Sequence, residues 1–568
     1  MGTGELQQGA PPVRGELAAL SVEREPGVPP WLPQEEMSLH SEDAADDARL
    51  VSLGYQPQLR RDFRLLTSLA ISFTIVSVLT GLTGLYGLGY QYGGPAAIIW
   101  SWPICVAFTT CIAAALGELC SAYPTSGGVY FWSYAVAPKS CRALAAWLTL
   151  WFNLTGLVGV EAGINFTFAA TFEATLQLAY PGFSLGAGGL FGVYAAITVI
   201  HGLINMLPIH YIGIMNCVSI GWHIAVTAVF CVLLPAVAPT HQPASFVFGK
   251  IITADKTAGI NNVAYSVLLS ALMSQFTLTG YEASAKMAEE SRKASTTSPW
   301  AIILTVLTSG VVGWVYLLAT TFSIVSPDTL LSPDNATGGK NVFAQVLYDA
   351  SVARFGDARA AIALLALILP AQAFAGASCL VDASRALFAF ARDRAVPHWM
   401  AWVHPKTRVP IVATWVMVAA SQAIALPMLG SLQAFTAVTS IATIGSYLSY
   451  GAPIALHLFT QLFRCSTFQP GPWHLGKWSI PICAVATFWV LFLTALFVLP
   501  TVLPVTPQTL NYAGALAGSV LVAALVMWVV SARKWFDGPN TSRKLAERSL
   551  LHGGEADGGG SSGASKGP

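Results

Sequence analysis

Charged side chains are scarce in this chain. Only 10% of its 568 residues are Asp, Glu, Lys or Arg, whereas 54% are hydrophobic. A soluble domain carries about 25% charged residues, so the composition excludes an ordinary soluble protein. The net charge of +1 argues against a nucleic-acid-binding protein, which requires a basic face.

Motifs that would indicate an enzyme, a metal site or a disulfide framework are also missing. Neither a complete phosphate-binding GxxxxGK[ST] pattern nor HExxH occurs, so an ATP-driven pump lacks its parts. We therefore expect no enzyme activity, no cofactor and no metal. His201, His210 and His223 lack metal-ligand spacing, and we expect them to be hydrogen-bonded structural residues. The nine cysteines are scattered, mostly in apolar stretches, and are expected to be buried small hydrophobes.

What the chain has instead is a series of long apolar segments. A membrane-spanning helix needs about 20 such residues, and we count about twelve segments of that kind, with short loops between them. The sequence therefore predicts an all-α membrane protein with 12 transmembrane helices. The expected spans are 65–88, 96–121, 144–172, 189–207, 212–237, 263–287, 301–325, 360–392, 410–429, 435–459, 480–499 and 510–530.

The distribution of Lys and Arg predicts the orientation. They gather in alternate loops and near both chain ends, and such loops are cytoplasmic. We therefore expect an integral membrane protein with both termini in the cytoplasm, in the plasma membrane or an organelle membrane. The polar tails 1–60 and 539–568 are expected to be disordered. Asn335 begins a glycosylation sequon in a predicted outer loop that also contains a short helix, 342–354.

Two of the predicted spans are interrupted by the same tripeptide, Leu-Thr-Gly, at 79–81 and at 278–280. Gly in a helix interior costs about 1 kcal/mol relative to Ala. Opened helices survive in a membrane only inside protein or beside a cavity. Matched interruptions in the two halves of a chain point to the central site of a transporter, although Leu, Thr and Gly are also common in membrane helices.

An unwound helix provides opposite partial charges from backbone alone. Its N-terminal end carries free N–H groups and about +0.5 charge, and its C-terminal end carries carbonyls and about −0.5. We expect the N–H groups around Thr80, Gly81 and Leu82 to hold a carboxylate. Carbonyls near Ser77 and 276–279 are expected to hold an amine.

Side chains beside the interruptions allow two interpretations each. The hydroxyls of Thr80 and Thr279 either bind substrate or bond the carbonyls of their own helices, as Thr often does. Phe276 either presents its aromatic face to the site as a lid or a partner for a cation, or packs in the core.

Ionisable residues near the second interruption are candidates for gating or proton coupling, because charge at membrane depth is expensive. Glu282 either takes up a proton or forms a structural ion pair with Lys286 one turn later. Lys286, Glu289 and Glu290 are expected to extend into the membrane interface. Glu118 is expected to serve an inner gate or to pack against loop cations.

Longer segments resemble the amino acid-polyamine-organocation superfamily. The similarity is closest to its amino acid/choline branch, which includes GABA permeases and plant bidirectional amino-acid transporters, and it covers roughly 53–539. The segments that carry it include Leu59-Arg-Arg-Asp-Phe63, Ser77-Val-Leu-Thr-Gly-Leu82, Ser121-Ala-Tyr-Pro-Thr-Ser-Gly-Gly128, Met273-Ser-Gln-Phe-Thr-Leu-Thr-Gly-Tyr-Glu282 and Ser440-Ile-Ala-Thr-Ile-Gly445.

This resemblance implies a fold like that of the bacterial leucine transporter. Two inverted five-helix repeats, 61–237 and 238–460, would be followed by two further helices within 461–538. The first and sixth helices would be unwound around the substrate. The implied substrate-binding residues are Ser77, Thr80 and Gly81 on one side, with Phe276, Thr279 and Gly280 opposite.

The implied function is secondary active transport of amino acids, such as GABA or neutral or basic α-amino acids, as a proton-coupled symporter or an exchanger. Relatives often read Asp and His where this chain has Glu282 and Lys286, a difference that bears on proton coupling and substrate charge. Two alternatives remain open. One is a choline, polyamine or nucleobase transporter of the same fold, and the other is an amino-acid receptor that does not transport.

Overall fold

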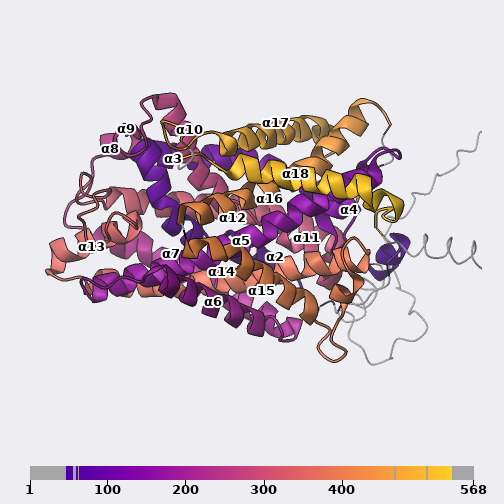
Figure 1. The fold of residues 1–568 in the computed structure, drawn as a ribbon, viewed down its shortest axis with the longest axis horizontal. Helices are drawn as coiled ribbons and strands as arrows, with labels where there is room; N and C mark the ends of the chain where they lie inside the picture. Colours follow the sequence, from indigo (N-terminus) through magenta and orange to yellow (C-terminus); the bar gives the residue numbers. More distant parts are fainter. Residues whose placement is uncertain are drawn as a thin grey trace, which may run out of the picture.

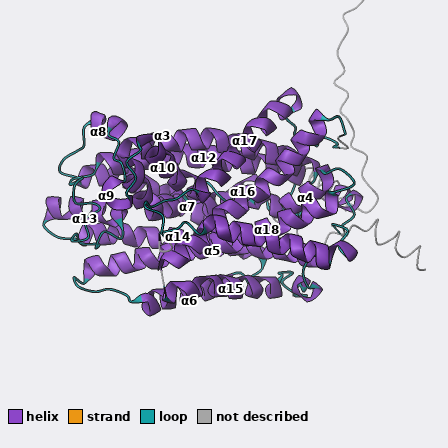
Figure 2. Ribbon diagram, turned by 45° about the horizontal axis from the view of Figure 1, so that its top comes forward, coloured by secondary structure: helices purple, strands orange, loops and turns teal. Residues whose placement is uncertain are grey.

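The computed structural model describes residues 46–539, apart from 56–58, 60, 62, 431, 466–467 and 507–508; the side chains of 256 and 432–439 are also not described. Most of both predicted disordered tails, 1–45 and 540–568, lies outside these residues. Within the described ranges all regular structure is helical (Figure 2), and Phe63 and Ser291 form an isolated bridge.

The helices have the following bounds. In the first half they are α2 (Leu65–Val76), α3 (Val78–Ala122), α4 (Gly128–Val136), α5 (Arg142–Ala179), α6 (Ala187–Ile204) and α7 (Ile209–Val237). The middle of the chain contains α8 (Ala244–Gly249), α9 (Asp255–Ala258), α10 (Val263–Thr277), α11 (Ala283–Lys286), η1 (Ala288–Glu290) and α12 (Ala294–Phe322). These are followed by α13 (Val342–Phe355), α14 (Arg359–Arg392), α15 (Ile411–Ala425), α16 (Leu432–Leu462), α17 (Ser479–Val498) and α18 (Ala513–Val530), with short 3₁₀ turns between.

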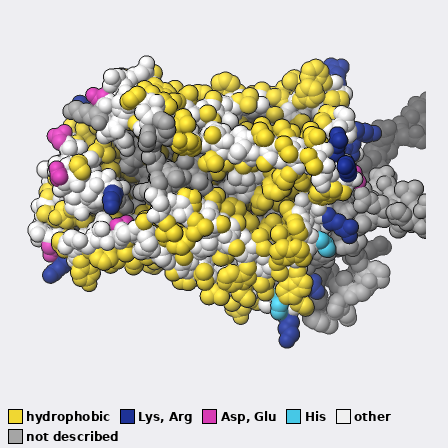
Figure 3. Space-filling view, in the orientation of Figure 1, with side chains coloured by type: hydrophobic (Ala, Val, Ile, Leu, Met, Phe, Trp, Pro, Cys, Tyr) yellow, Lys and Arg dark blue, Asp and Glu magenta, His cyan; other side chains and the backbone are white. Residues whose placement is uncertain are grey.

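Nine helical segments of the described chain are long and apolar enough to cross a membrane, and α10 is a shorter apolar helix. The first of these segments, Leu65–Ala122, is 58 residues long. A non-helical Gly94 (φ 69°) divides it within α3. Hydrophobic side chains form a broad band across the middle of the face shown in Figure 3. An all-helical membrane protein is therefore confirmed, whereas the number of twelve spans and the inverted repeat stay predictions.

The long helices run side by side along the longest axis of the molecule (Figure 1). α17 and α18 lie along one side, and α6 and α15 lie along the opposite side. Between them, α3 packs against α10 and α12, and α5 packs against α14 and α16. The two helices next to the predicted interruptions, α3 and α10, therefore pack against each other, and α3 also packs against α12.

The two ends of the helix bundle differ in charge. We call the end with α8, α9 and α13 the loop end, and the end where the described chain begins and finishes the termini end (Figure 1). Lys and Arg gather at the termini end, while most acidic side chains visible in this view lie at the loop end (Figure 3). This asymmetry agrees with the positive-inside rule, and a cytoplasmic termini end remains our prediction.

The segment 46–55 differs from the expected disordered tail. Residues 46–52 are helical, and Leu50 and Tyr55 are buried. The Tyr55 hydroxyl donates to Asp393 (3.0 Å), and Arg392 lies over the Tyr55 ring. Sequence composition did not reveal this docking, because the contacts join residues more than 300 positions apart.

Candidate functional site

The first interruption lies at Ser77, one turn before the predicted position. Ser77 adopts left-handed backbone angles (φ 32°) between α2 and α3. Its hydroxyl accepts a hydrogen bond from the Thr80 N–H (3.2 Å), so it caps α3. Gly81 N–H donates to the Ser77 carbonyl (2.9 Å), which is the first helical bond of α3. Placing the break at Gly81 was therefore wrong, because a capping serine outweighs the weak helix propensity of glycine.

This shift changes which backbone groups are exposed. The first N–H groups of a helix have no partner within the helix, and in α3 these belong to Val78 and Leu79 rather than to Gly81 and Leu82. Leu82 is fully buried inside α3. The positive end of the α3 dipole nevertheless lies at this interruption, as the anion-binding argument requires.

His223 of α7 contacts the same interruption, which the sequence did not indicate. Its Nε2 lies 2.7 Å from the Ser77 hydroxyl, and its Nδ1 lies 2.8 Å from the Ser219 carbonyl of its own helix. A carbonyl only accepts, so Nδ1 carries the proton and Nε2 accepts from Ser77 when the ring is neutral. His223 is thus hydrogen-bonded, as expected, but it also supports the residue that opens the helix.

The second interruption lies at the predicted tripeptide. α10 ends at Thr277, and Gly280 has φ 90°, a conformation that L side chains rarely adopt. Its N–H faces the Tyr450 hydroxyl (3.3 Å), and Tyr447 donates to the Leu278 carbonyl (2.8 Å). Both tyrosines come from α16, so a distant helix holds the opened backbone.

The two threonines form local hydrogen bonds. Thr279 donates to the Gln275 carbonyl of its own helix (2.9 Å), and the Thr80 hydroxyl lies 2.6 Å from the Ser77 hydroxyl. Both residues are only 4% exposed. For Thr279 the alternative of bonding its own helix therefore holds in this structure.

A cavity of about 370 Å³ adjoins both interruptions. Thr80 and Gly81 line it from α3, and Phe276 and Thr279 line it from α10 and the residues just after it. Other walls come from α5 and α16 and from the connection between α17 and α18 at the loop end. Leu510 in this connection is 40% exposed, so part of the cavity lining lies at the loop-end surface. Ser77, Leu82 and Gly280 lie beside the cavity without lining it.

Phe276 lies at the cavity and also packs against a neighbouring ring, and its role as a lid or as a partner for a cation stays a prediction. It lines the cavity, and its ring packs edge-on against Phe497 with centroids 5.0 Å apart. Every residue that the structure places around the cavity is uncharged, so the polarity available to a ligand comes from hydroxyls, Asn511 and the backbone.

Glu282 and Lys286 belong to a buried cluster instead of the cavity wall. Lys286 Nζ lies 2.9 Å from Glu282 and 2.8 Å from Asp382 of α14. The Tyr450 hydroxyl donates to the other oxygen of Glu282 (2.5 Å). Lys286 is only 1% exposed. The expectation that Lys286 extends into the membrane interface was wrong. Asp382, which lies far from Lys286 in the sequence, provides a buried counterion.

Glu289 and Glu290 are likewise buried and paired, contrary to the interfacial expectation. Glu289 makes two bonds to Arg392 (2.9 and 3.1 Å) and accepts from the Ser126 N–H. Glu290 lies 3.7 Å from Arg385. These pairs join the residues after α11 to α14 at the termini end.

Glu118 binds neither loop cations nor the cavity. Its carboxylate accepts from the Ser479 hydroxyl (2.6 Å) and the Leu475 N–H (3.1 Å), and it lies 3.8 Å from His457. It therefore ties the end of α3 to the segment that precedes α17.

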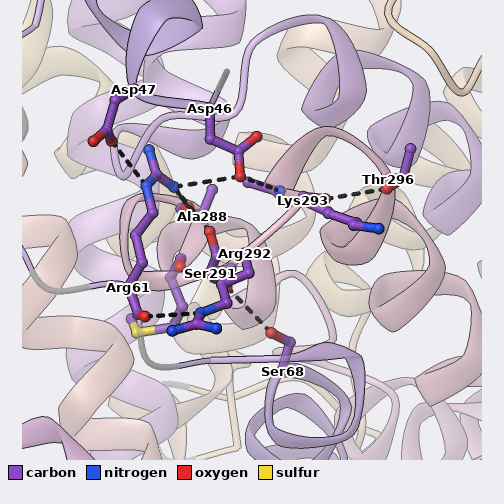
Figure 4. Close-up of polar contacts among 11 residues, drawn as sticks. Asp46, Asp47, Arg61, Ser68, Ala288, Ser291, Arg292, Lys293 and Thr296 are labelled. Atoms are coloured by element: carbon purple, nitrogen blue, oxygen red, sulfur yellow. Dashed lines mark hydrogen bonds and ion pairs between the residues drawn. The ribbon is translucent and has the colours of Figure 1, made fainter. Parts of the chain in front are cut away.

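A further set of contacts joins the N-terminal segment to the residues after α11, and we call it the termini-end network (Figure 4). Arg61 binds Asp47 (2.9 Å) and donates to the carbonyls of Ala288 (3.3 Å) and Ser291 (2.8 Å). Next to it, the Arg292 N–H donates to the Phe63 carbonyl (2.8 Å), and the Phe63 N–H donates to the Glu290 carbonyl (3.0 Å). In this conformation the termini end is fastened, whereas the cavity reaches the loop end.

The described residues offer no group of three or more His, Cys, Asp or Glu side chains suited to a metal. All nine cysteines are free, and Cys465 is exposed, unlike the buried role expected for it. His201 also differs from expectation. It is buried, and neither ring nitrogen has a hydrogen-bond partner in the described chain.

Comparison with known proteins agrees with this arrangement. The sequence profile of a family described as "Amino acid permease" matches residues 63–524. The chain is 39% identical over 501 residues to the amino-acid permease BAT1 homolog of Oryza sativa subsp. japonica, covering 87% of this chain and 95% of that protein. It is 38% identical over 497 residues to amino-acid permease BAT1 of Arabidopsis thaliana, with coverage of 86% and 95%. Amino-acid permease 2 of Neurospora crassa is 29% identical over 509 residues, with coverage of 88% and 90%. An all-helical membrane protein with two opened helices beside a central cavity, matched along most of its length by permeases, belongs to the amino acid permease family.

Proposed function

We propose that this permease is a secondary active transporter of zwitterionic amino acids, GABA or neutral α-amino acids, and that it works by alternating access with a proton or exchange gradient. The observation that carries the proposal is the uncharged cavity between two opened helices. A zwitterion has no net charge, so it needs two opposite partial charges and no neutralising side chain.

The helix ends supply those partial charges. In this proposal the N-terminal end of α3 would face the substrate carboxylate, and the C-terminal end of α10 would face its amine. A basic amino acid, choline or a polyamine would bring a net positive charge into a wall whose described residues include no carboxylate. Burying such a charge unpaired is strongly unfavourable, and this favours a zwitterion over those substrates.

The difference between the two ends of the helix bundle, one fastened and one accessible, supports alternating access. Part of the cavity lining lies at the loop-end surface, while the termini-end network and the pair Glu289–Arg392 fasten the other end. Transport would require these contacts to break as the loop end closes. Glu282 is our candidate for proton coupling, because its cluster with Lys286 and Asp382 carries a net charge of about −1 when all three ionise.

The test is uptake by the purified chain in vesicles, with labelled GABA, a neutral and a basic α-amino acid, choline and a polyamine, each with and without an imposed pH gradient. We expect accumulation of zwitterions. Accumulation of choline or polyamine alone would contradict the substrate assignment. Binding of a labelled amino acid without accumulation or exchange would identify the non-transporting receptor instead.

The site itself is tested by Thr80→Val, which keeps the shape and removes the hydroxyl at the first interruption. We expect loss of uptake with normal amounts of folded protein in the membrane. Thr110→Val is the matched control, because Thr110 also lies on α3 but donates to the Val106 carbonyl (2.7 Å) and does not line the cavity. Normal uptake by Thr80→Val would refute the site assignment.

A further inference from the structure

A second buried polar site lies where α5, α6 and α14 meet, separate from the cavity and from the Glu282 cluster. It contains Glu161 on α5 and His201 on α6, each only 1% exposed. An ionisable pair at this depth in a membrane protein calls for a function, because the burial of charge is expensive.

The geometry joins these two side chains without satisfying them. His201 Nδ1 lies 3.8 Å from Glu161 Oε1. Asn165 Nδ2 donates to the same oxygen (2.8 Å) and lies 3.1 Å from the Thr198 hydroxyl. Within the described chain, Glu161 Oε2, both nitrogens of His201 and Asn165 Oδ1 have no hydrogen-bond partner. Buried polar atoms are normally paired, so unpaired ones that converge on one place indicate an occupant.

Gly376 of α14 closes the third side of this site. A methyl group at that position would lie 2.7 Å from Asn165 Oδ1 and 2.8 Å from His201 Nδ1. Those distances are too short for a carbon atom, so the absence of a side chain lets α14 cover the polar atoms closely. The space is accordingly too small for an amino acid, and the described residues provide no metal-binding group there.

Neighbouring titratable groups leave the charge of Glu161 uncompensated. Tyr194 of α6 and Cys379 of α14 interact electrostatically with Glu161, and the Cys379 thiol is also a hydrogen-bond partner of this carboxylate; both residues are ordinarily neutral. Cys379 also senses Asp382 and Lys286, which are paired with each other. α15 contributes a neutral face, since its Ser421 bonds Tyr194. With Glu161 ionised and His201 neutral, the site would hold an unbalanced negative charge, and one added proton makes it neutral overall.

We propose that Glu161 and His201 together bind one proton, and that this proton is linked to transport through α5. The link rests on the proposed function. Gly159, Val160, Gly163 and Ile164 of α5 line the substrate cavity, whereas Glu161 contacts α6 on another face of the same helix. Gain or loss of the proton changes how α5 packs against α6 and α14, and the cavity wall moves with that helix.

The site is tested first without transport. The full chain in lipid nanodiscs is measured near neutral pH by infrared spectroscopy for a protonated carboxyl and by nitrogen NMR for an imidazolium. We expect one of these signals to disappear in Glu161→Gln and in His201→Gln. Glu173→Gln is the matched control, because this second carboxylate of α5 accepts from the Leu185 N–H (3.1 Å) and Gln177 (3.2 Å) elsewhere on the helix. An ionised Glu161 beside a neutral His201, with neither signal, would overturn the proposal.

The link to transport is tested by counterflow of labelled amino acid as pH is varied. We expect Glu161→Gln to shift the pH profile and Glu173→Gln to leave it as in the unmodified protein. A bound proton with an unchanged profile in Glu161→Gln would refute the link. Failure of the unmodified chain to exchange any amino acid would count against the proposed function instead, while the spectroscopic result would stand.

Discussion

The close approach of α3 to α10 leads to a quantitative prediction at Gly81. A methyl group added at Gly81 would lie 2.5 Å from Thr277 Cγ2 and 2.6 Å from Thr277 Oγ1. Thr277 has little freedom to rotate away, because it is β-branched and its hydroxyl donates to the Met273 carbonyl (3.0 Å). Overpacking of this kind costs about 1–3 kcal/mol. We expect Gly81→Ala to destabilise the protein by that amount and to reduce uptake.

A second substitution separates this clash from other causes. Thr277→Ala removes the two nearest of the three Thr277 atoms that the new methyl group would meet and leaves only Cβ, at 2.9 Å, so the double variant Gly81→Ala/Thr277→Ala is expected to regain part of the lost stability. Gly221→Ala on α7 is the control, since a methyl group there meets no atom within 4 Å. That exposed helical glycine is expected to tolerate alanine, with a change of no more than about 1 kcal/mol.

The assay combines thermal unfolding in detergent with uptake into vesicles for all four variants. We expect Gly81→Ala to be less stable than the double variant, and Gly221→Ala to be nearly as stable as the unmodified protein. If Gly81→Ala were as stable and active as Gly221→Ala, or if Thr277→Ala gave no recovery, close packing at this point would not be what holds the two helices together.

Three further predictions concern the second interruption and its neighbours. Gly280→Ala is expected to destabilise the protein more than Gly81→Ala, because backbone strain at φ 90° of about 1–3 kcal/mol adds to a clash with Ile75. The additional substitution Ile75→Ala should recover only the stability lost to the clash, and unfolding temperatures of the variants check this. Glu282→Gln is expected to alter the pH dependence of uptake while the fold survives, because Lys286 keeps its other carboxylate, and an unaltered profile would remove the proposed proton role. Arg61→Ala is expected to loosen the termini end, since it removes charge-assisted hydrogen bonds worth about 1.5–3 kcal/mol each. The distribution of distances between spin labels on α2 and α14 would then broaden. An unchanged distribution would contradict this role of the termini-end network.

Sequence was informative where local chemistry dominates. The interruption at Gly280 follows from a residue that tolerates positive φ, and its place was predicted correctly. At the first interruption the glycines were misleading, because the Ser77 side chain, which accepts a hydrogen bond from the Thr80 N–H, determined where the helix begins. Ser77 was named as a site residue, but its capping role was not anticipated.

The contact partners of these residues could not be predicted from the neighbouring sequence. His223 meets Ser77 across 146 positions, and Asp382 meets Lys286 across 96. Burial of Lys286, Glu289 and Glu290 was missed for the same reason, since the position of a residue near the end of a span suggests contact with the interface unless a counterion from another helix is known. Only the folded arrangement brings those counterions together.

The uncharged cavity has a consequence for selectivity. In the transporter that we propose, amino acids that differ in the separation of amine and carboxylate would meet described wall residues that carry no charge, so the distance between the two helix ends would select substrates by length. Two glycines allow the close approach of the helices there, Gly81 against the Thr277 side chain and Gly280 against the Ile75 side chain. A single methyl group added at either glycine would therefore alter the distance between the helix ends and with it the preferred substrate length.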